Sequence, residues 1–317
     1  MTAQASAALS SSLSARAKRL RNDVIYATVG LFVALLTRLP RRLTVIFCRA
    51  LGAIAFVILG SARHRARSRL QAGLGSERIP GATVRAAFAS IGAMLADTLC
   101  LLRPFEKAST SLSLDPASRA VFHEALDEGR GVVFVAAHLG PWERMAALLA
   151  EQGFPVAAVA RESSDPRITR IYEKIRRPRG VRSIYRKSPG APMAIARELA
   201  RGGAVGFLID LPSRVPCARA RLFGEEADIP LGPARIALAR QAAVVVGTCA
   251  PAPNGGESAP IVLITRIPTG DLTPGTEGEA ELMRRLAQAL EARIRAWPEA
   301  WLGLFVRPRL RADDVPR

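Results

Sequence analysis

The sequence predicts an α/β fold in which a mixed central sheet is flanked by helices and preceded by an N-terminal membrane-associated helical segment. After residue 80, short apolar runs with the length of buried strands alternate with stretches of helical periodicity. Before it, two longer apolar stretches are embedded in arginine-rich sequence. No Pro/Gly/Ser linker divides the chain, so we expect a disordered basic N-terminus over residues 1–22, a membrane-associated helical segment over 23–70 and one further domain over 71–317.

The apolar runs of the N-terminal segment are short for a membrane span. Residues 1–15 are rich in Ala and Ser, which leads us to expect disorder there. The first apolar run, Val24–Leu36, is shorter than the roughly 20 residues that a helix needs to cross the bilayer core. Residues 43–60 are interrupted by Arg49 and precede a basic run that ends at Arg69. We predict a helical hairpin that enters or lies in the cytoplasmic leaflet, with one true span as the alternative.

The remaining elements follow from apolar periodicity and from Pro, Gly and Asp at their ends. We expect, in chain order, helices 81–102 and 116–127, strand 132–137, helix 141–151, strand 155–160, helix 165–177, strand 181–185, helix 191–200, strands 204–209, 243–248 and 261–265, and helix 277–295. The strands together would form a sheet of six or more.

The most informative stretch runs from Gly131 to Glu143, where an apolar strand ends in His138 and Glu143 follows five residues later. Pro141 suits the first position of a helix, which places His138 in the strand-to-helix turn and Glu143 in the first helical turn. Their side chains can then converge, and a carboxylate beside an imidazole makes it a better base. The alternative is a structural loop histidine and a glutamate that only favours the helix N-terminus.

Two more polar residues follow apolar strands directly: Arg161 and Asp210. If the strands are parallel, these side chains and His138 gather at one edge of the sheet, where open α/β sheets bind ligands. Arg161 would bind a phosphate or stabilise an oxyanion, or else is a surface arginine. Asp210 would orient another group or accept a sugar hydroxyl, or else caps its strand.

The net charge and the cysteine content indicate which classes of binding partner and of site the protein has. The net charge is +18, and arginine outnumbers lysine by 41 to 4, which suits phosphorylated or anionic partners. We predict no nucleic-acid partner, because the sequence has no zinc-finger spacing and few aromatic residues to stack on bases. The four cysteines are far apart, and we predict neither a metal site nor a catalytic cysteine.

The stretch around His138 resembles the H-x4-D/E acyltransferase motif, in the form found in the bacterial lipid A late acyltransferase family of the lysophospholipid acyltransferase-like superfamily. The resemblance runs from about residue 25 to 309, through blocks at Val159–Pro166, Arg177–Gly180, Gly203–Asp210, Leu222–Gly224 and Pro230–Ala234. It implies a glycerolipid acyltransferase-like fold, an N-terminal membrane anchor, and substrate contacts near Gly140, Trp142 and Arg177. The chain departs from the family at Pro141, at Leu211, and in the ending from Leu304 to Arg309.

The resemblance implies an O-acyltransferase at the cytoplasmic face of the bacterial inner membrane. The donor would be an acyl carrier protein thioester or acyl-CoA, with no other cofactor, and the acceptor a membrane glycolipid such as a lipid A precursor. A His138–Glu143 dyad would act as general base, with Arg161 or backbone N–H groups of residues 139–142 at the oxyanion. No Ser or Cys stands beside His138 as a nucleophile, so we expect direct transfer. Acylation of another glycolipid or phospholipid, and an inactive lipid-binding scaffold, are the alternatives.

Overall fold

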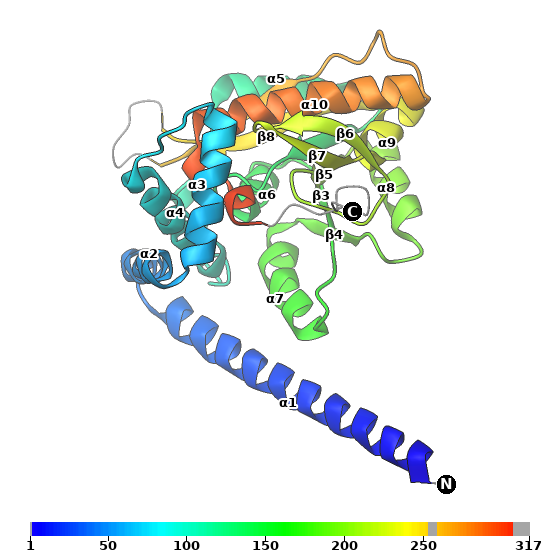
Figure 1. Ribbon diagram of the computed structural model, residues 1–317. Coiled ribbons are helices and arrows are strands. Elements are labelled where there is room, and N and C mark those ends of the chain that lie inside the picture. Colours follow the sequence, from blue (N-terminus) through cyan, green and yellow to red (C-terminus); the bar gives the residue numbers. More distant parts are fainter. Residues whose placement is uncertain (1, 253–258, 307–317) are drawn as a thin grey trace.

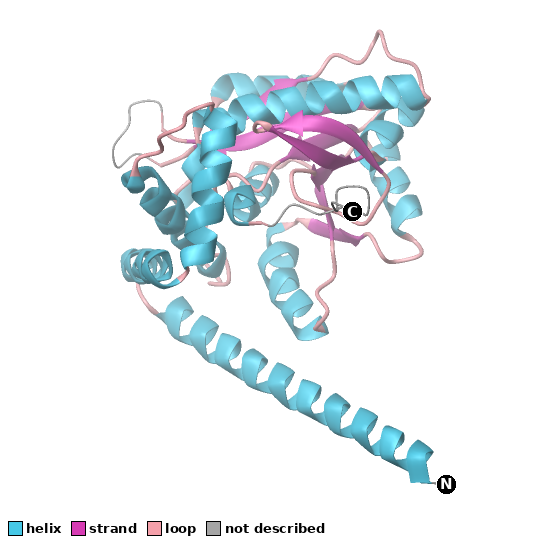
Figure 2. Ribbon diagram, viewed as in Figure 1, coloured by secondary structure: helices cyan, strands magenta, loops and turns pink. Residues whose placement is uncertain are grey.

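The computed structural model describes residues 2–252 and 259–306 of the chain. Its centre is a seven-stranded sheet with strand order β1-β9-β8-β2-β5-β3-β4. The strands β8, β2, β5, β3 and β4 are parallel, whereas β9 pairs antiparallel with β8 and carries β1 at the edge. The predicted α/β fold with a mixed sheet is confirmed. Figures 1 and 2 show the sheet between its helices and the first helix projecting from the body.

The strands of the main sheet are β1 (Ser113–Leu114), β2 (Val132–Ala136), β3 (Val156–Ala160), β4 (Arg182–Tyr185), β5 (Ala204–Leu208), β8 (Ala243–Ala250) and β9 (Ile261–Arg266). A separate antiparallel hairpin consists of β6 (Cys217–Leu222) and β7 (Glu225–Pro230). The helices after the N-terminal segment are α4 (Gly81–Cys100), α5 (Pro116–Asp127), α6 (Trp142–Glu151), α7 (Pro166–Arg176), α8 (Ala191–Ala200), α9 (Gly232–Arg240) and α10 (Thr276–Ala296).

The central position of β2, which is covered on both faces, explains why its sequence is apolar throughout. Val133 and Val135 belong to a core with α8, α9 and α10, while Val132, Phe134 and Ala136 face a second core with α5 and α6. A parallel strand covered on both faces has no solvent side, so it shows no alternation of polar and apolar residues. The apolar run that marks the strand in the sequence thus reflects its central position.

Local features of the structure differ from the predictions. Pro141 is the N-cap of α6, and the helix itself begins at Trp142. Helix α9, the short edge strand β1 and the β6–β7 hairpin were not predicted. The hairpin escapes the sequence pattern because charged residues occupy much of both strands, as in Arg219, Arg221 and Glu226, so it lacks the apolar run of a buried strand.

The N-terminal segment is helical in the structure, including residues for which the sequence predicts disorder. Helix α1 begins at Thr2 and continues to Arg38, followed by α2 (Arg41–Ile58) and α3 (Gly60–Leu74). The stretch before Gly30 has neither Pro nor Gly and is rich in Ala, the best helix former, which favours a continuous helix. Residues Leu20–Arg38 are long and apolar enough to cross a membrane and are only 6% buried.

Two further parts of this region meet the same test of length and composition. They are α4, whose window is 44% buried, and α2 with α3 taken as one span bent by 94°. Helices α2 and α4 lie in close contact through glycines: a Cβ at Gly52 would come within 2.3 Å of the Phe88 carbonyl oxygen, and one at Gly92 within 2.1 Å of the Cys48 carbonyl oxygen. Helix α4 is therefore a packed partner of α2.

Candidate active site

The turn between β2 and α6 carries the candidate site. Gly140 adopts a left-handed conformation with φ of 62°, and a Cβ there would lie 2.8 Å from the Trp297 ring, so the turn requires glycine. The Gly140 N–H donates to the Ala300 carbonyl at 3.0 Å, and the Trp142 N–H donates to the Gly140 carbonyl at 2.9 Å. Both N–H groups are therefore engaged within the protein. Gly140 shapes the turn.

His138 is held by Asp210, which ends the neighbouring strand β5. The His138 Nδ1 lies 2.8 Å from Asp210 Oδ1, and the His138 backbone N–H donates to Oδ2 at 3.0 Å. Trp301 adds a third bond from its indole N–H to Oδ2 at 2.8 Å. The Asp210 side chain is fully buried. Burial opposes its ionisation, but His138 and these hydrogen bonds outweigh it and lower the pKa of Asp210.

Glu143 forms an ion pair with Arg176, at the end of α7. The two Arg176–Glu143 contacts measure 2.9 and 2.5 Å, and both side chains are largely buried. Burial lowers the pKa of Arg176, and the bonds to Glu143 more than offset it, so the pKa is raised. The carboxylate bonded to His138 is thus Asp210, which corrects the expected direct pairing with Glu143. The buried Glu143 needs a countercharge, and Arg176 supplies it.

His138, Trp142, Glu143 and Arg176 line one cavity of about 830 Å³. The rings of His138 and Trp142 meet edge to face with centroids 5.0 Å apart. Asp210 is not among the residues that line this cavity, and its buried side chain lines a small neighbouring cavity instead. Since Nδ1 is engaged with Asp210, the other ring nitrogen, Nε2, is the one left for chemistry in the larger cavity.

Arg161 also lines the large cavity, together with Arg186. They directly follow β3 and β4, whose last registered pair is Ala160 and Tyr185, so the two arginines stand side by side at the carboxyl edge. Burial and then the charge of Arg161 lower the pKa of Arg186. Over residues 2–252 and 259–306 neither arginine forms an ion pair with a carboxylate, and Arg186 donates to the Ser213 hydroxyl at 2.7 Å. This arrangement suits an anion.

A narrow apolar slot of about 70 Å³ adjoins the cavity between α6 and the sheet. It shares Trp142, Glu143 and Arg176 with the cavity and continues past small side chains at Ala146 and Ala158 to Gly206. A Cβ at Gly206 would meet only the Ala157 carbonyl oxygen within 4 Å, at 3.5 Å. The absence of a side chain at Gly206 therefore leaves this slot open.

The predicted site residues lie in or next to the cavity, with the exception of Arg177. His138, Trp142, Glu143 and Arg161 line the cavity, with Asp210 bonded to His138 and Gly140 in the turn. Arg177 is exposed at the start of a short 3-10 helix and is not among the residues that line the cavity.

Sequence reasoning missed Arg176, Arg186 and Trp301. Arg176 directly precedes the expected Arg177, and a helical-face assignment for α7 could have found it, because Ile168, Tyr172 and Arg176 recur at helical spacing and line the cavity. Arg186 directly follows a predicted strand, as Arg161 does. No local signal marks Trp301, which comes from the distant C-terminal segment. Among the described residues, no group of three or more His, Cys, Asp or Glu is placed to hold a metal ion.

Comparison with protein families gives one match that covers most of the chain. The model described as bacterial lipid A biosynthesis acyltransferase matches residues 14–311. Comparison with curated proteins gives no match.

Proposed function

Because the chain belongs to the bacterial lipid A biosynthesis acyltransferase family, we propose that it moves a fatty acyl chain from a thioester to a hydroxyl of a lipid A-type glycolipid. The donor is an acyl carrier protein thioester or acyl-CoA. The family and the apolar N-terminal helices indicate membrane association, and we place the reaction at the cytoplasmic face of the bacterial inner membrane. The observation that carries the proposal is the buried Asp210 bonded to His138 at the cavity wall.

His138 acts as general base through Nε2. Its Nδ1–H is donated to ionised Asp210, which fixes the tautomer and stabilises the imidazolium that forms when Nε2 takes a proton. Asp210 keeps its charge because three donors satisfy it. General-base assistance of this kind contributes about 10²- to 10⁴-fold to the rate.

The reaction proceeds by direct transfer. The acceptor hydroxyl oxygen bonds to the thioester carbonyl carbon while its proton passes to His138 Nε2, giving a tetrahedral oxyanion. The oxyanion collapses, the carbon–sulfur bond breaks, and the imidazolium returns the proton to the leaving thiolate. The products are an acyl ester and a free thiol, so atoms and charge balance without a covalent enzyme intermediate.

Cationic groups at the cavity wall support the charged species. Arg161 and Arg186 form a site for a phosphate group of the acceptor or of the donor's pantetheine arm. Arg176, held by Glu143, lies at the mouth of the apolar slot and is placed to stabilise the oxyanion. Glu143 thereby acts through Arg176 rather than on His138.

The acyl chain occupies the apolar slot between α6 and the sheet. The slot begins beside Trp142 and Glu143, close to His138, and its remaining lining is apolar. Burial of a hydrocarbon chain there gains about 0.8 kcal/mol per methylene, which favours a chain that fills the slot.

The test is mass spectrometry of lipid A and total glycolipids from cells lacking the gene and complemented with wild type, His138→Ala or His123→Ala. His123 lies in α5, outside the cavity, and serves as the matched control. We expect deletion to give a lipid lighter by one acyl group, restored by wild type and His123→Ala but not by His138→Ala. A change in another glycolipid or phospholipid would reassign the acceptor. Full restoration by His138→Ala would contradict the enzymatic function and favour a lipid-binding scaffold.

A further inference from the structure

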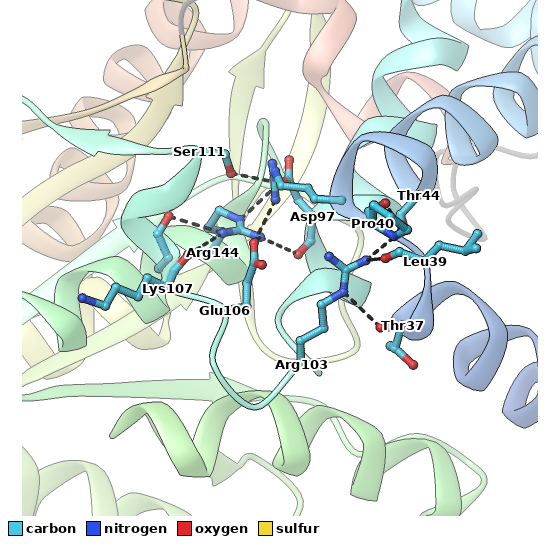
Figure 3. A network of polar contacts seen from close by, with 12 residues as sticks. Thr37, Leu39, Pro40, Thr44, Asp97, Arg103, Glu106, Lys107, Ser111 and Arg144 are labelled. Atoms are coloured by element: carbon cyan, nitrogen blue, oxygen red, sulfur yellow. Dashed lines mark hydrogen bonds and ion pairs between the residues drawn. The ribbon is translucent and has the colours of Figure 1, made fainter.

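Arg144, the residue after Glu143, is fully buried. Its guanidinium donates to the carbonyls of Lys107 at 3.0 Å and Asp97 at 3.2 Å, and to Glu106 Oε1 at 3.0 Å. Its Nε lies 3.1 Å from Asp97 Oδ1. Figure 3 shows these contacts converging on Arg144 from the end of α4 and the loop that follows. The first turn of α6 is therefore anchored to elements outside the sheet.

A second arginine shares the same two carboxylate oxygens. Arg41, the first residue of α2, lies 2.7 Å from Asp97 Oδ1 and 3.1 Å from Glu106 Oε1. Arg41, Asp97, Glu106 and Arg144 form what we call the anchor cluster, with two positive and two negative charges. Because charges out of water are costly unless they are paired, each member of the cluster constrains the others.

The loop that supplies Glu106 also holds the end of the membrane-candidate helix. Arg103 donates to the carbonyls of Thr37 at 3.2 Å and Leu39 at 2.6 Å, and to the Thr44 hydroxyl at 2.8 Å. It thus satisfies acceptors at the C-terminal end of α1, which have no partner within the helix (Figure 3). The end of α1, the start of α2 and the start of α6 are joined through one loop, Arg103–Lys107.

We propose that Arg41 is a positioning residue, which acts through the anchor cluster to hold Glu143 and Arg176 at the cavity wall. Glu143 and Arg144 are adjacent in the first turn of α6, so a displacement of one moves the other. Loss of Arg41 leaves one carboxylate of the cluster uncompensated and changes the field in which Arg144 sits. This proposal rests on the proposed function. It implies that the alignment of the reacting groups depends on how the start of α2 packs against Asp97 and Glu106.

The experiment compares Arg41→Ala, Arg41→Lys and Arg42→Ala in the full chain reconstituted in vesicles. Arg42 is exposed, so the Arg42→Ala variant removes the same charge one residue away and serves as the matched control. The first readout is kcat and KM for acyl transfer. The second is hydrogen exchange of the backbone amides of residues 142–147, which does not require activity. Thermal unfolding of each variant reports its overall stability.

We expect Arg41→Ala to lower kcat about five-fold or more at nearly unchanged KM and to speed exchange in residues 142–147, because small misplacements of reacting groups are costly. Arg41→Lys should recover most of kcat, and Arg42→Ala should leave both readouts unchanged. The proposal is overturned if Arg41→Ala matches Arg42→Ala, or if exchange rises equally throughout the chain, which would mean a purely structural role. Absence of transfer by wild type would refute the proposed function, while the exchange data would still decide the positioning role.

Discussion

Asp210 Oδ1 lies 2.8 Å from His138 Nδ1, although the two residues are 72 positions apart in the chain. They meet because β2 and β5 are paired in parallel, with Ala136 opposite Leu208, and each residue follows its own strand by two positions. The same carboxylate also accepts the His138 backbone N–H. The pairing of two strands therefore fixes both the position and the tautomer of the candidate base.

Replacing Asp210 with Asn should lower kcat by about 10²- to 10⁴-fold with little change in KM, because the imidazolium loses its countercharge and the tautomer is no longer enforced. Steady-state kinetics with an acyl thioester and a lipid A-type acceptor measure this. Asp127→Asn, exposed at the end of α5 and away from both cavities, serves as the control carboxylate. A variant at Asp210 that keeps wild-type kcat would remove this residue from the mechanism.

Asp210 should also contribute a pH-dependent part of the stability. Its pKa in the folded chain is lowered, so its contribution is complete above the unfolded value of about 3.9 and is lost as pH falls towards the folded pKa. We expect the melting temperature of wild type to fall more steeply below about pH 4 than that of Asp210→Asn. Parallel curves for the two proteins in detergent would contradict this expectation.

The Glu143–Arg176 pair should be sensitive to removal of one partner. Both side chains are largely buried, so Glu143→Gln leaves Arg176 without its countercharge and should destabilise the protein by about 3–5 kcal/mol. The double variant Glu143→Gln/Arg176→Gln should regain part of that loss. Denaturant unfolding of the single and double variants measures the coupling, and strictly additive losses would show that the two residues act independently.

Arg161→Gln and Arg186→Gln should each raise KM about 10-fold or more for the substrate that carries the recognised phosphate, since a hydrogen bond to a charged group is worth roughly 1.5–3 kcal/mol. Lys187→Gln, exposed and next to Arg186, is the matched control.

Two comparisons identify the source of that phosphate. If it belongs to the acceptor, the penalty disappears with a dephosphorylated acceptor. If it belongs to the donor, the penalty disappears with an acyl-pantetheine that lacks the phosphate. An unchanged KM in both arginine variants with all four substrates would leave the pair without a binding role.

Gly206→Val should shift the preferred acyl chain towards shorter lengths. A Cβ at Gly206 enters space without a steric clash, so the larger side chain fills the slot. Gly206→Ala should give a smaller shift in the same direction. Competition between thioesters of graded length, read by mass spectrometry, checks this, with thermal unfolding as the folding control. An unchanged length profile in both variants would place the acyl chain elsewhere.

The sequence alone was sufficient for six of the seven strands of the main sheet, all but the two-residue edge strand β1, and for most of the helices. Buried parallel strands are apolar at every position, so runs such as 132–137 and 204–209 are visible without any tertiary information. The parallel arrangement then predicts which strand ends meet, and this brought His138, Arg161 and Asp210 to one edge. Their catalytic roles stay a prediction.

Partnership between charged side chains was decided only by the tertiary structure. Glu143 and Asp210 were both candidates near His138, and the spacing along the chain favoured Glu143. The parallel pairing of β2 and β5 instead places Asp210 against His138. Glu143 pairs with Arg176 at the end of α7. The anchor cluster joins Arg41, Asp97, Glu106 and Arg144 from four separate segments. Local periodicity reports which face of an element is buried, but which charges meet depends on how helices pack across the sheet, and that information is spread over the whole chain.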